Sequence, residues 1–413
     1  MPDATTQPEA TRSLTAQAFA AAAALAPPVA VFAPLSMAPL LALLAATLLI
    51  GDWRRAMASI RTQRALAISL ALLSLWGAVT SLWSPIPTHS LFEAIRLAVI
   101  NLAGLVVLGA GGALDMAAAP RLGRALTIGI AASVILLQLE LRDGQPVWHL
   151  LHSGQVDRTA SLAAYDRGVT VLLLTAWPAA AALASRRNII ALLLGIAAVA
   201  VTLLEFKSLT SVLAAALGLV AAMAAWRWPR SLAGLMSTGA LLLVIVLPLL
   251  TPGGSAIGHI RQEAPTLKAS AIHRLVIWRF VADRIAERPL LGWGMDASRA
   301  IPGGEMQASD VMPEAKLPLG ATMLPLHPHD AALQWRLELG LPGALLCVTV
   351  LGVVLWRVAD SALMVPQRAL ALGYAAAVLV IAMLSFGAWQ AWWLSAIWLT
   401  AAFVTGARPR SAS

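Results

Sequence analysis

The sequence has 413 residues, of which 59% are hydrophobic and only 12% charged, with a mean hydropathy of +0.79. Soluble globular proteins carry charge at about a quarter of their positions, so this composition excludes an ordinary soluble domain and predicts an all-α polytopic membrane protein. The single cysteine, Cys347, excludes an internal disulfide and a metal site built on two cysteines.

Twelve mainly apolar segments are predicted to form transmembrane helices, because a spanning helix needs about 20 such residues. The first two segments are the least distinct, since Pro27-Pro28 interrupts one of them and only a short link around Pro34 separates them. We expect one integral membrane domain over residues 1–413, preceded by no cleaved leader. The predicted segments are 16–33, 36–51, 65–83, 91–113, 125–141, 168–185, 189–205, 209–226, 231–250, 340–356, 369–386 and 391–406.

The arginines of the short links predict the orientation in the membrane. The links 84–90 and 387–390 carry no lysine or arginine. The positive-inside rule therefore places the arginine-rich links and both termini in the cytoplasm, with residues 251–331 and the smaller segment 142–166 outside it. The formal net charge of +9 is then explained by topology rather than by nucleic-acid binding. The arginines used are Arg54, Arg55, Arg61, Arg64, Arg121, Arg124, Arg186, Arg187, Arg227, Arg230, Arg357, Arg368, Arg408 and Arg410.

Within the large outer segment, residues 271–287 have the apolar period of a helix, which ends before Pro289. Arg274 and Trp278 are one turn apart on its face, so a guanidinium and an indole project together. This pair suits a phosphate or the face of a sugar. A helix lying at the membrane surface with its arginines directed to water is the equally weighted alternative.

The outer segment ends in His327-Pro328-His329-Asp330. Because proline is common at a helix start, we expect His329 and Asp330 to lie in the first turn of a helix. A neutral His329 could act as a general base, although an adjacent carboxylate would favour its protonation. A metal site that also uses His273 is a weaker alternative, and an ordinary surface histidine is the unspecific one.

Three ordered motifs resemble the conserved region of the O-antigen ligase and polymerase superfamily, whose members are bacterial inner-membrane enzymes. They are Arg274-x3-Trp278, then the Leu-Leu-Gly-Trp-Gly run after Pro289, then His329-Asp330 followed after nine residues by Gly-Leu-Pro-Gly. The histidine of the ligase motif maps to His329. Asp330 departs from the pattern, since an amide or hydroxyl residue is usual there.

A second match lies at the start of the span 168–185, where Tyr165-Asp166-Arg167-Gly168 supplies an arginine at a family position. The resemblance implies a GT-C-like glycosyltransferase with interfacial helices in a large periplasmic loop. It implies transfer of O-antigen polysaccharide from undecaprenyl pyrophosphate to a lipid A-core sugar, with inversion and with no metal or cofactor. The implied residues are His329 as base, Arg167 and Arg274 on the pyrophosphate, and Arg96, Lys207, Trp278 and Asp330 in support.

Other functions stay open at this point. An O-antigen polymerase has a similar topology but a lipid-linked acceptor, and a protein O-oligosaccharyltransferase normally extends further beyond its last span. A transporter should place ionisable residues within its spans, whereas most spans here lack them. The remaining interpretations are an ion pair of Glu93 with Arg96, an aromatic belt of Trp389, Trp392, Trp393 and Trp398, close packing at Gly340 and Gly343, and alternative bases Glu287, Glu305, Asp310 and Glu314.

Overall fold

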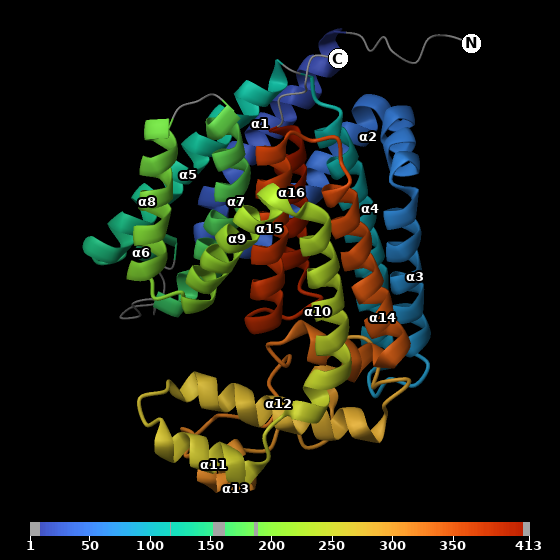
Figure 1. The fold of residues 1–413 in the computed structure, drawn as a ribbon, viewed down its shortest axis with the longest axis vertical. Helices are drawn as coiled ribbons and strands as arrows, with labels where there is room; N and C mark the ends of the chain where they lie inside the picture. The colour runs from blue at the N-terminus through green and yellow to red at the C-terminus, as the bar shows by residue number, and fades with distance from the viewer. Residues whose placement is uncertain (1–8, 116, 152–161, 186–188, 408–413) are drawn as a thin grey trace.

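The computed structural model describes residues 9–115, 117–151, 162–185 and 189–407. These residues contain helices and loops, with one isolated bridge between Gln307 and Thr322 and no strand. Arg186, Arg187, Arg408 and Arg410, used above for orientation, lie outside the described residues. Figure 1 shows a bundle of long helices with a layer of shorter helices across one end, opposite both ends of the described chain.

Each of the twelve apolar segments falls on a helix. Among the described residues, eight helices are long and apolar enough to cross a membrane, and three further apolar helices are shorter. The all-α polytopic membrane fold is therefore confirmed, while the number of spans stays a prediction. The long helices are α1 (Glu9–Phe32), α2 (Met37–Thr62), α3 (Arg64–Thr80), α4 (Pro87–Gly112), α5 (Ala118–Arg142), α7 (Asp166–Ser185), α8 (Ile189–Glu205), α9 (Leu209–Arg227), α10 (Pro229–Leu250), α14 (Ala331–Ala359), α15 (Val365–Leu384) and α16 (Ala391–Gly406).

Helix α14 changes direction at Gly340, whose φ of +65° and ψ of −164° are not helical. A side chain at this position would collide with the carbonyl oxygen of Leu290, which accepts a hydrogen bond from the Leu341 amide at 3.0 Å. Gly343 similarly leaves room for Trp76 of α3. The two glycines thus allow the close packing expected of them, and the break separates residues 331–339 from the apolar part of α14.

The layer at the end of the bundle consists of α11 (Gly254–Glu263), α12 (Ala269–Glu287), the short α13 (Ala308–Val311) and the loops between them. Helix α12 matches the helix predicted over 271–287. The layer has its own hydrophobic core, in which Val276 and Phe280 of α12 pack with Ile257 of α11 and with Leu333 of α14. Because this core includes α14, burial of apolar side chains holds the layer against the bundle.

Candidate active site

Arg167 lies at the start of α7, in the run Tyr165-Asp166-Arg167-Gly168. The other three residues of this run are held by contacts within the protein. The Tyr165 hydroxyl donates to Glu140 at 2.5 Å inside an aromatic cluster. The Asp166 carboxylate accepts from the Ser208 hydroxyl at 2.5 Å, which ties α7 to the start of α9. Gly168 lets α7 approach α1, because an added Cβ would lie 2.5 Å from a Cα of α1.

The Arg167 side chain itself is exposed. Its guanidinium carbon lies 5.7 Å from the ring centroid of Trp392, a distance typical of a cation–π contact. Trp389, Trp392 and Trp393 are buried at 5%, 3% and 2% exposure, so the expected aromatic belt at the lipid boundary is wrong for them. These indoles pack within the protein, and one of them supports Arg167.

Arg274 lies on α12 between two side chains that hold the loop before α14. The His273 ring nitrogen Nε2 is 2.7 Å from the Thr322 carbonyl oxygen, and the Trp278 indole donates to the Pro328 carbonyl oxygen at 3.1 Å. Trp278 thus positions the backbone directly before His329. The indole that was predicted, together with Arg274, to suit a phosphate or the face of a sugar therefore already uses its N–H within the protein.

His329 has a φ of +57° and lies just before α14. Its Nδ1 is 2.7 Å from the carbonyl oxygen of Ser385, at the end of α15. A carbonyl oxygen only accepts, so Nδ1 carries the hydrogen and a neutral ring keeps Nε2 as a free acceptor. The His327 ring lies beside it, tilted by 59°, with 4.3 Å between the ring centroids.

Burial lowers the pKa of His329 below the ordinary 6.5, the Ser385 carbonyl opposes this, and the charge of Arg274 lowers it further. Burial also lowers the pKa of His327 to about 3, with contributions from His329, Arg299 and Arg167. The pKa of Arg274 is lowered by burial and raised by Asp166. Arg274 thus lies within electrostatic reach of His329, and Arg167 within reach of His327, whose ring lies beside that of His329.

The expectation that His329 and Asp330 lie in a first helical turn is wrong. Helix α14 begins at Ala331, and Asp330 is its N-cap, with one carboxylate oxygen accepting from the Leu333 amide at 2.8 Å. The extended backbone of Asp330 and the positive φ of His329 keep both residues out of the helix. Asn, Ser and Asp all serve as N-caps, so the departure from the family pattern preserves this local structure.

Arg96 and Lys207, the two basic residues predicted to support the pyrophosphate site, differ in their surroundings. Arg96 on α4 forms an ion pair with Glu93 and donates to the Trp389 carbonyl oxygen at 3.2 Å. The predicted ion pair is therefore present. Lys207 is exposed in the turn between α8 and α9, with a φ of +53°, next to the Ser208 that holds Asp166.

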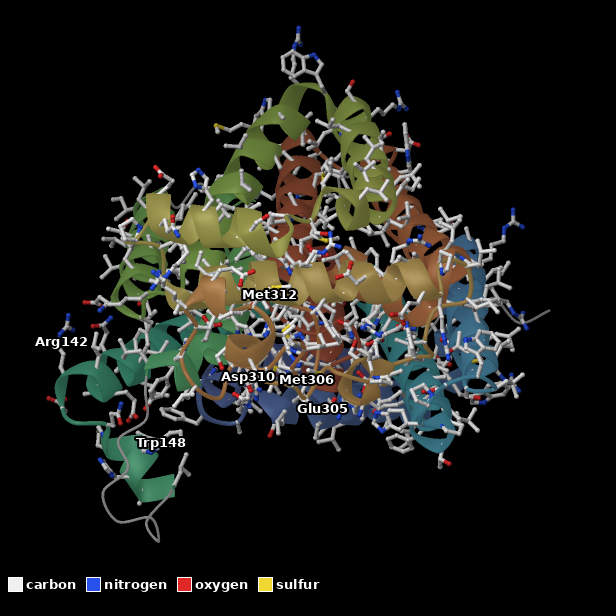
Figure 2. All side chains as sticks on the ribbon, turned by 90° about the horizontal axis from the view of Figure 1, so that it is seen from below. Arg142, Trp148, Glu305, Met306, Asp310 and Met312 are labelled. Carbon is white, nitrogen blue, oxygen red and sulfur yellow. The ribbon has the colours of Figure 1, made fainter. Side chains whose placement is uncertain are left out.

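The alternative carboxylates lie in the layer. Glu287 is paired with Arg284 at 2.7 Å, while Glu305 and Asp310 are exposed. Seen from the α12 end, Asp310 of α13 and Glu305 of the preceding loop lie beside α12, over the end of the bundle (Figure 2). Neither exposed carboxylate is held as His329 is, whose half-buried ring has Nδ1 2.7 Å from the Ser385 carbonyl oxygen.

Glu338 is a buried residue whose role the sequence did not reveal. Its carboxylate accepts from the Asp296 amide at 2.9 Å, the Trp389 indole at 2.5 Å and Gln334 at 3.1 Å. It therefore joins the Leu-Leu-Gly-Trp-Gly loop, the start of α14 and the link between α15 and α16. The sequence feature that could have indicated this role is a single acidic residue directly before an apolar segment.

Within the described part of the chain, His89, Glu93 and Asp296 form one group whose potential metal-binding atoms lie within 4.8 Å of one another. Asp296 is also paired with His89 at 2.8 Å and with Arg299 at 2.7 Å. Because Glu93 is paired with Arg96, each carboxylate already has a cationic partner. These residues fit an ion-pair network better than a metal site.

The fold defines a polytopic helical membrane protein, and the half-buried His329 lies beside His327 and within electrostatic reach of Arg274. A family model described as O-antigen ligase matches residues 190–348. Proteins of Rickettsia conorii, Rickettsia bellii and Rickettsia typhi, provisionally named polysaccharide ligases, are 29%, 29% and 30% identical to the chain. The chain belongs to the O-antigen ligase family.

The aligned regions cover most of this chain and of these relatives. They comprise 68%, 78% and 67% of this chain, and 65%, 76% and 66% of the Rickettsia conorii, bellii and typhi proteins. The chain thus spans just under two thirds of the Rickettsia conorii protein. The family model includes Arg274 and His329 but begins after Arg167.

Proposed function

We propose that this protein transfers a polysaccharide from undecaprenyl pyrophosphate to a sugar hydroxyl of lipid A-core. In the reaction, the acceptor oxygen forms a bond to the anomeric carbon while the bond from that carbon to the pyrophosphate oxygen breaks. The hydroxyl proton passes to Nε2 of His329, and undecaprenyl pyrophosphate leaves. Attack from the face opposite the leaving group inverts the anomeric centre without a covalent enzyme intermediate.

The single observation that carries this proposal is the surroundings of the His329 ring, which favour a neutral imidazole with its hydrogen on Nδ1. A general base must be unprotonated and must present a lone pair. Burial and the charge of Arg274 lower the pKa of His329, and the Ser385 carbonyl holds the hydrogen on Nδ1. Nε2 is therefore free to accept a proton near neutral pH.

Arg167 and Arg274 are assigned to the pyrophosphate. The leaving group carries several negative charges, and guanidinium groups offer planar donors that stay charged. The electrostatic influence of Arg274 on His329 and of Arg167 on His327 supports a position for both beside the base. Arg96 and Lys207 are proposed to add positive charge around the donor. With these arginines, a divalent cation is dispensable, so full activity in excess chelator is expected.

The protein is proposed to lie in the bacterial inner membrane, with both termini in the cytoplasm and the α11–α13 layer in the periplasm. The arginines of the short links support this orientation. The layer lies at the end of the bundle opposite the start of α1 and the end of α16 (Figure 1). No nucleotide is required there, because the donor bond is already activated.

The test is a reconstituted assay with purified protein, lipid-linked O-antigen and lipid A-core. Transfer that requires lipid A-core supports the ligase function, and elongation of the donor alone would instead identify a polymerase. Transport of the donor with no transfer would refute the enzymatic proposal. His329→Ala should abolish transfer, and Glu305→Gln is the control for a carboxylate base. Activity lost on chelation and restored by magnesium would contradict the assignment of the arginines.

A further inference from the structure

The Glu338 carboxylate is fully buried, at 0% exposure, and is surrounded by hydrogen-bond donors. Its Oε1 accepts from the Ser298 hydroxyl and from Nε2 of Gln334 at 3.1 Å. Its Oε2 accepts from the Asp296 amide at 2.9 Å and from the Trp389 indole at 2.5 Å. A carboxylate has about four lone-pair sites, so these donors use its capacity at both oxygens. Because a backbone amide, an indole and a glutamine Nε2 can only donate, the position requires a side chain that accepts at both ends.

Gln334, one turn before Glu338 on α14, connects the same carboxylate to the link 385–390 between α15 and α16. Its Nε2 donates to Glu338, while its Oε1 accepts from the Ala388 amide at 2.8 Å. Gln334 is itself buried, at 1% exposure. The next residue of the link, Trp389, donates to Glu338 directly. The link is therefore attached to α14 at two neighbouring residues, and both attachments lead to Glu338.

The same link carries the hydrogen-bond partner of His329. Ser385 begins the link, and its carbonyl oxygen lies 2.7 Å from Nδ1 of His329. His329 is in turn fixed to the start of α14, because the next residue, Asp330, is the N-cap of that helix. The two partners of the His329–Ser385 hydrogen bond thus belong to the start of α14 and to the link, the two segments that Glu338 holds together.

We propose that Glu338 is a positioning residue for the base, which keeps the Ser385 carbonyl at Nδ1 of His329 by holding the link 385–390 against α14. This inference rests on the proposed function for the role of His329 in the reaction. A separation of about 3.6 Å no longer makes a hydrogen bond, so a displacement of the link by about 1 Å is enough to release Nδ1. The hydrogen of the neutral ring can then move to Nε2, and Nε2 no longer has a lone pair for the proton of the acceptor hydroxyl.

Exchanging the two polar side chains of α14 tests this role. In Glu338→Gln the new amide nitrogen meets a donor whichever way the amide is turned, so the attachment to Gln334 or to Trp389 is lost. In the double variant that combines Glu338→Gln with Gln334→Glu, the new amide donates to the new carboxylate, which still accepts from the Ala388 amide. The double variant also keeps the number of charges. We therefore expect the single variant to release the link and the double variant to restore it.

The first measurement is the nitrogen NMR spectrum of purified protein with isotope-labelled histidine in nanodiscs, which distinguishes hydrogen on Nδ1 from hydrogen on Nε2. His329→Gln identifies the signals of His329. Near neutral pH, the wild type and the double variant should carry the hydrogen on Nδ1, and Glu338→Gln should show both tautomers. The second measurement is the initial rate of transfer. Glu338→Gln should lower kcat about 10–100-fold with the KM for the donor changed by less than about twofold, and the double variant should recover most of kcat.

Gln63→Ala is the matched control. Gln63 is also buried, at 6% exposure, and its Nε2 donates to the Leu105 carbonyl oxygen at 3.2 Å. It lies in the turn between α2 and α3, at the end of the bundle away from the α11–α13 layer (Figure 1). This control should lower the unfolding temperature and change neither the tautomer of His329 nor kcat.

Hydrogen that stays on Nδ1 in Glu338→Gln would overturn the proposal. So would both tautomers in a double variant that unfolds at the temperature of the wild type. If Glu338→Gln does not fold, Gln334→Met gives the same comparison, because it keeps the length of the side chain and removes only the attachment from Glu338 to the Ala388 amide. Hydrogen confined to Nδ1 in Gln334→Met would then refute the positioning role.

These readouts separate the inference from the proposed function. The tautomer of His329 is measured without substrate, so the role of Glu338 is decided even if transfer to lipid A-core is not observed. Conversely, full transfer by Glu338→Gln with an unchanged tautomer would leave the ligase function in place and refute only the positioning role.

Discussion

Asp330→Asn is expected to stabilise the protein at alkaline pH without loss of transfer. Asp330 is 5% exposed, and burial raises its pKa to about 7, against the ordinary 3.8. Its side chain caps α14 through the Leu333 amide. Asparagine caps a helix as well as aspartate does, so the substitution keeps the cap and removes the charge.

The size of the effect follows from this pKa. Below pH 3.8 the carboxyl group is protonated in both the folded and the unfolded protein, and burial of charge costs nothing. As the pH rises towards 7, the unfolded chain loses the proton and the folded protein keeps it, so stability falls. The pKa of Asp330 in the folded protein is about three pH units above its ordinary value. Above pH 7 this difference lowers the free energy of unfolding by at most about 4 kcal/mol. Asp330→Asn should therefore gain stability over the wild type as the pH rises from 4 to 8.

The assay is thermal unfolding of both proteins in the same detergent at a series of pH values, with transfer activity measured in parallel. Asp330→Ala is the control, because it removes the cap as well as the charge and should cost about 1 kcal/mol at low pH, where the wild-type carboxyl group is neutral. A difference between Asp330→Asn and wild type that does not change between pH 4 and pH 8 would refute the reasoning.

Three further predictions concern the same region. His329→Gln should lower kcat/KM by about 10²–10⁴-fold with little change in unfolding temperature, as measured by initial rates and by calorimetry; retention of full activity would exclude it as base. The acid limb of the pH–rate profile should lie below the ordinary histidine value of 6.5, because burial lowers the pKa of His329; a limb above 6.5 would contradict this. Gly340→Ala should cost at least about 1–3 kcal/mol in chemical unfolding, because of its positive φ and the nearby Leu290 carbonyl; an unchanged midpoint would argue against the break in α14.

The apolar segments and the motif residues could be predicted because both are local properties of the chain. A run of apolar residues long enough to cross a bilayer has few alternatives to a helix, since its backbone groups must be satisfied internally. The period of residues 271–287 likewise predicted α12. The start of α14 was misplaced, because Pro328 is a common helix start but a side chain at Asp330 captured the free Leu333 amide instead.

The sequence by itself determined a polytopic helical membrane protein and singled out Arg167, Arg274 and His329 as residues of interest. Only the tertiary structure decided that Arg274 lies within electrostatic reach of His329, that a hydrogen bond to Ser385 sets the tautomer of His329, and that Glu338 joins three segments. An apolar cavity of about 760 Å³ within the bundle is also a tertiary feature, lined by six helices from distant parts of the chain. Hydrophobic length and helical period are recorded in neighbouring residues, whereas burial and hydrogen-bond partners depend on which distant segments pack together.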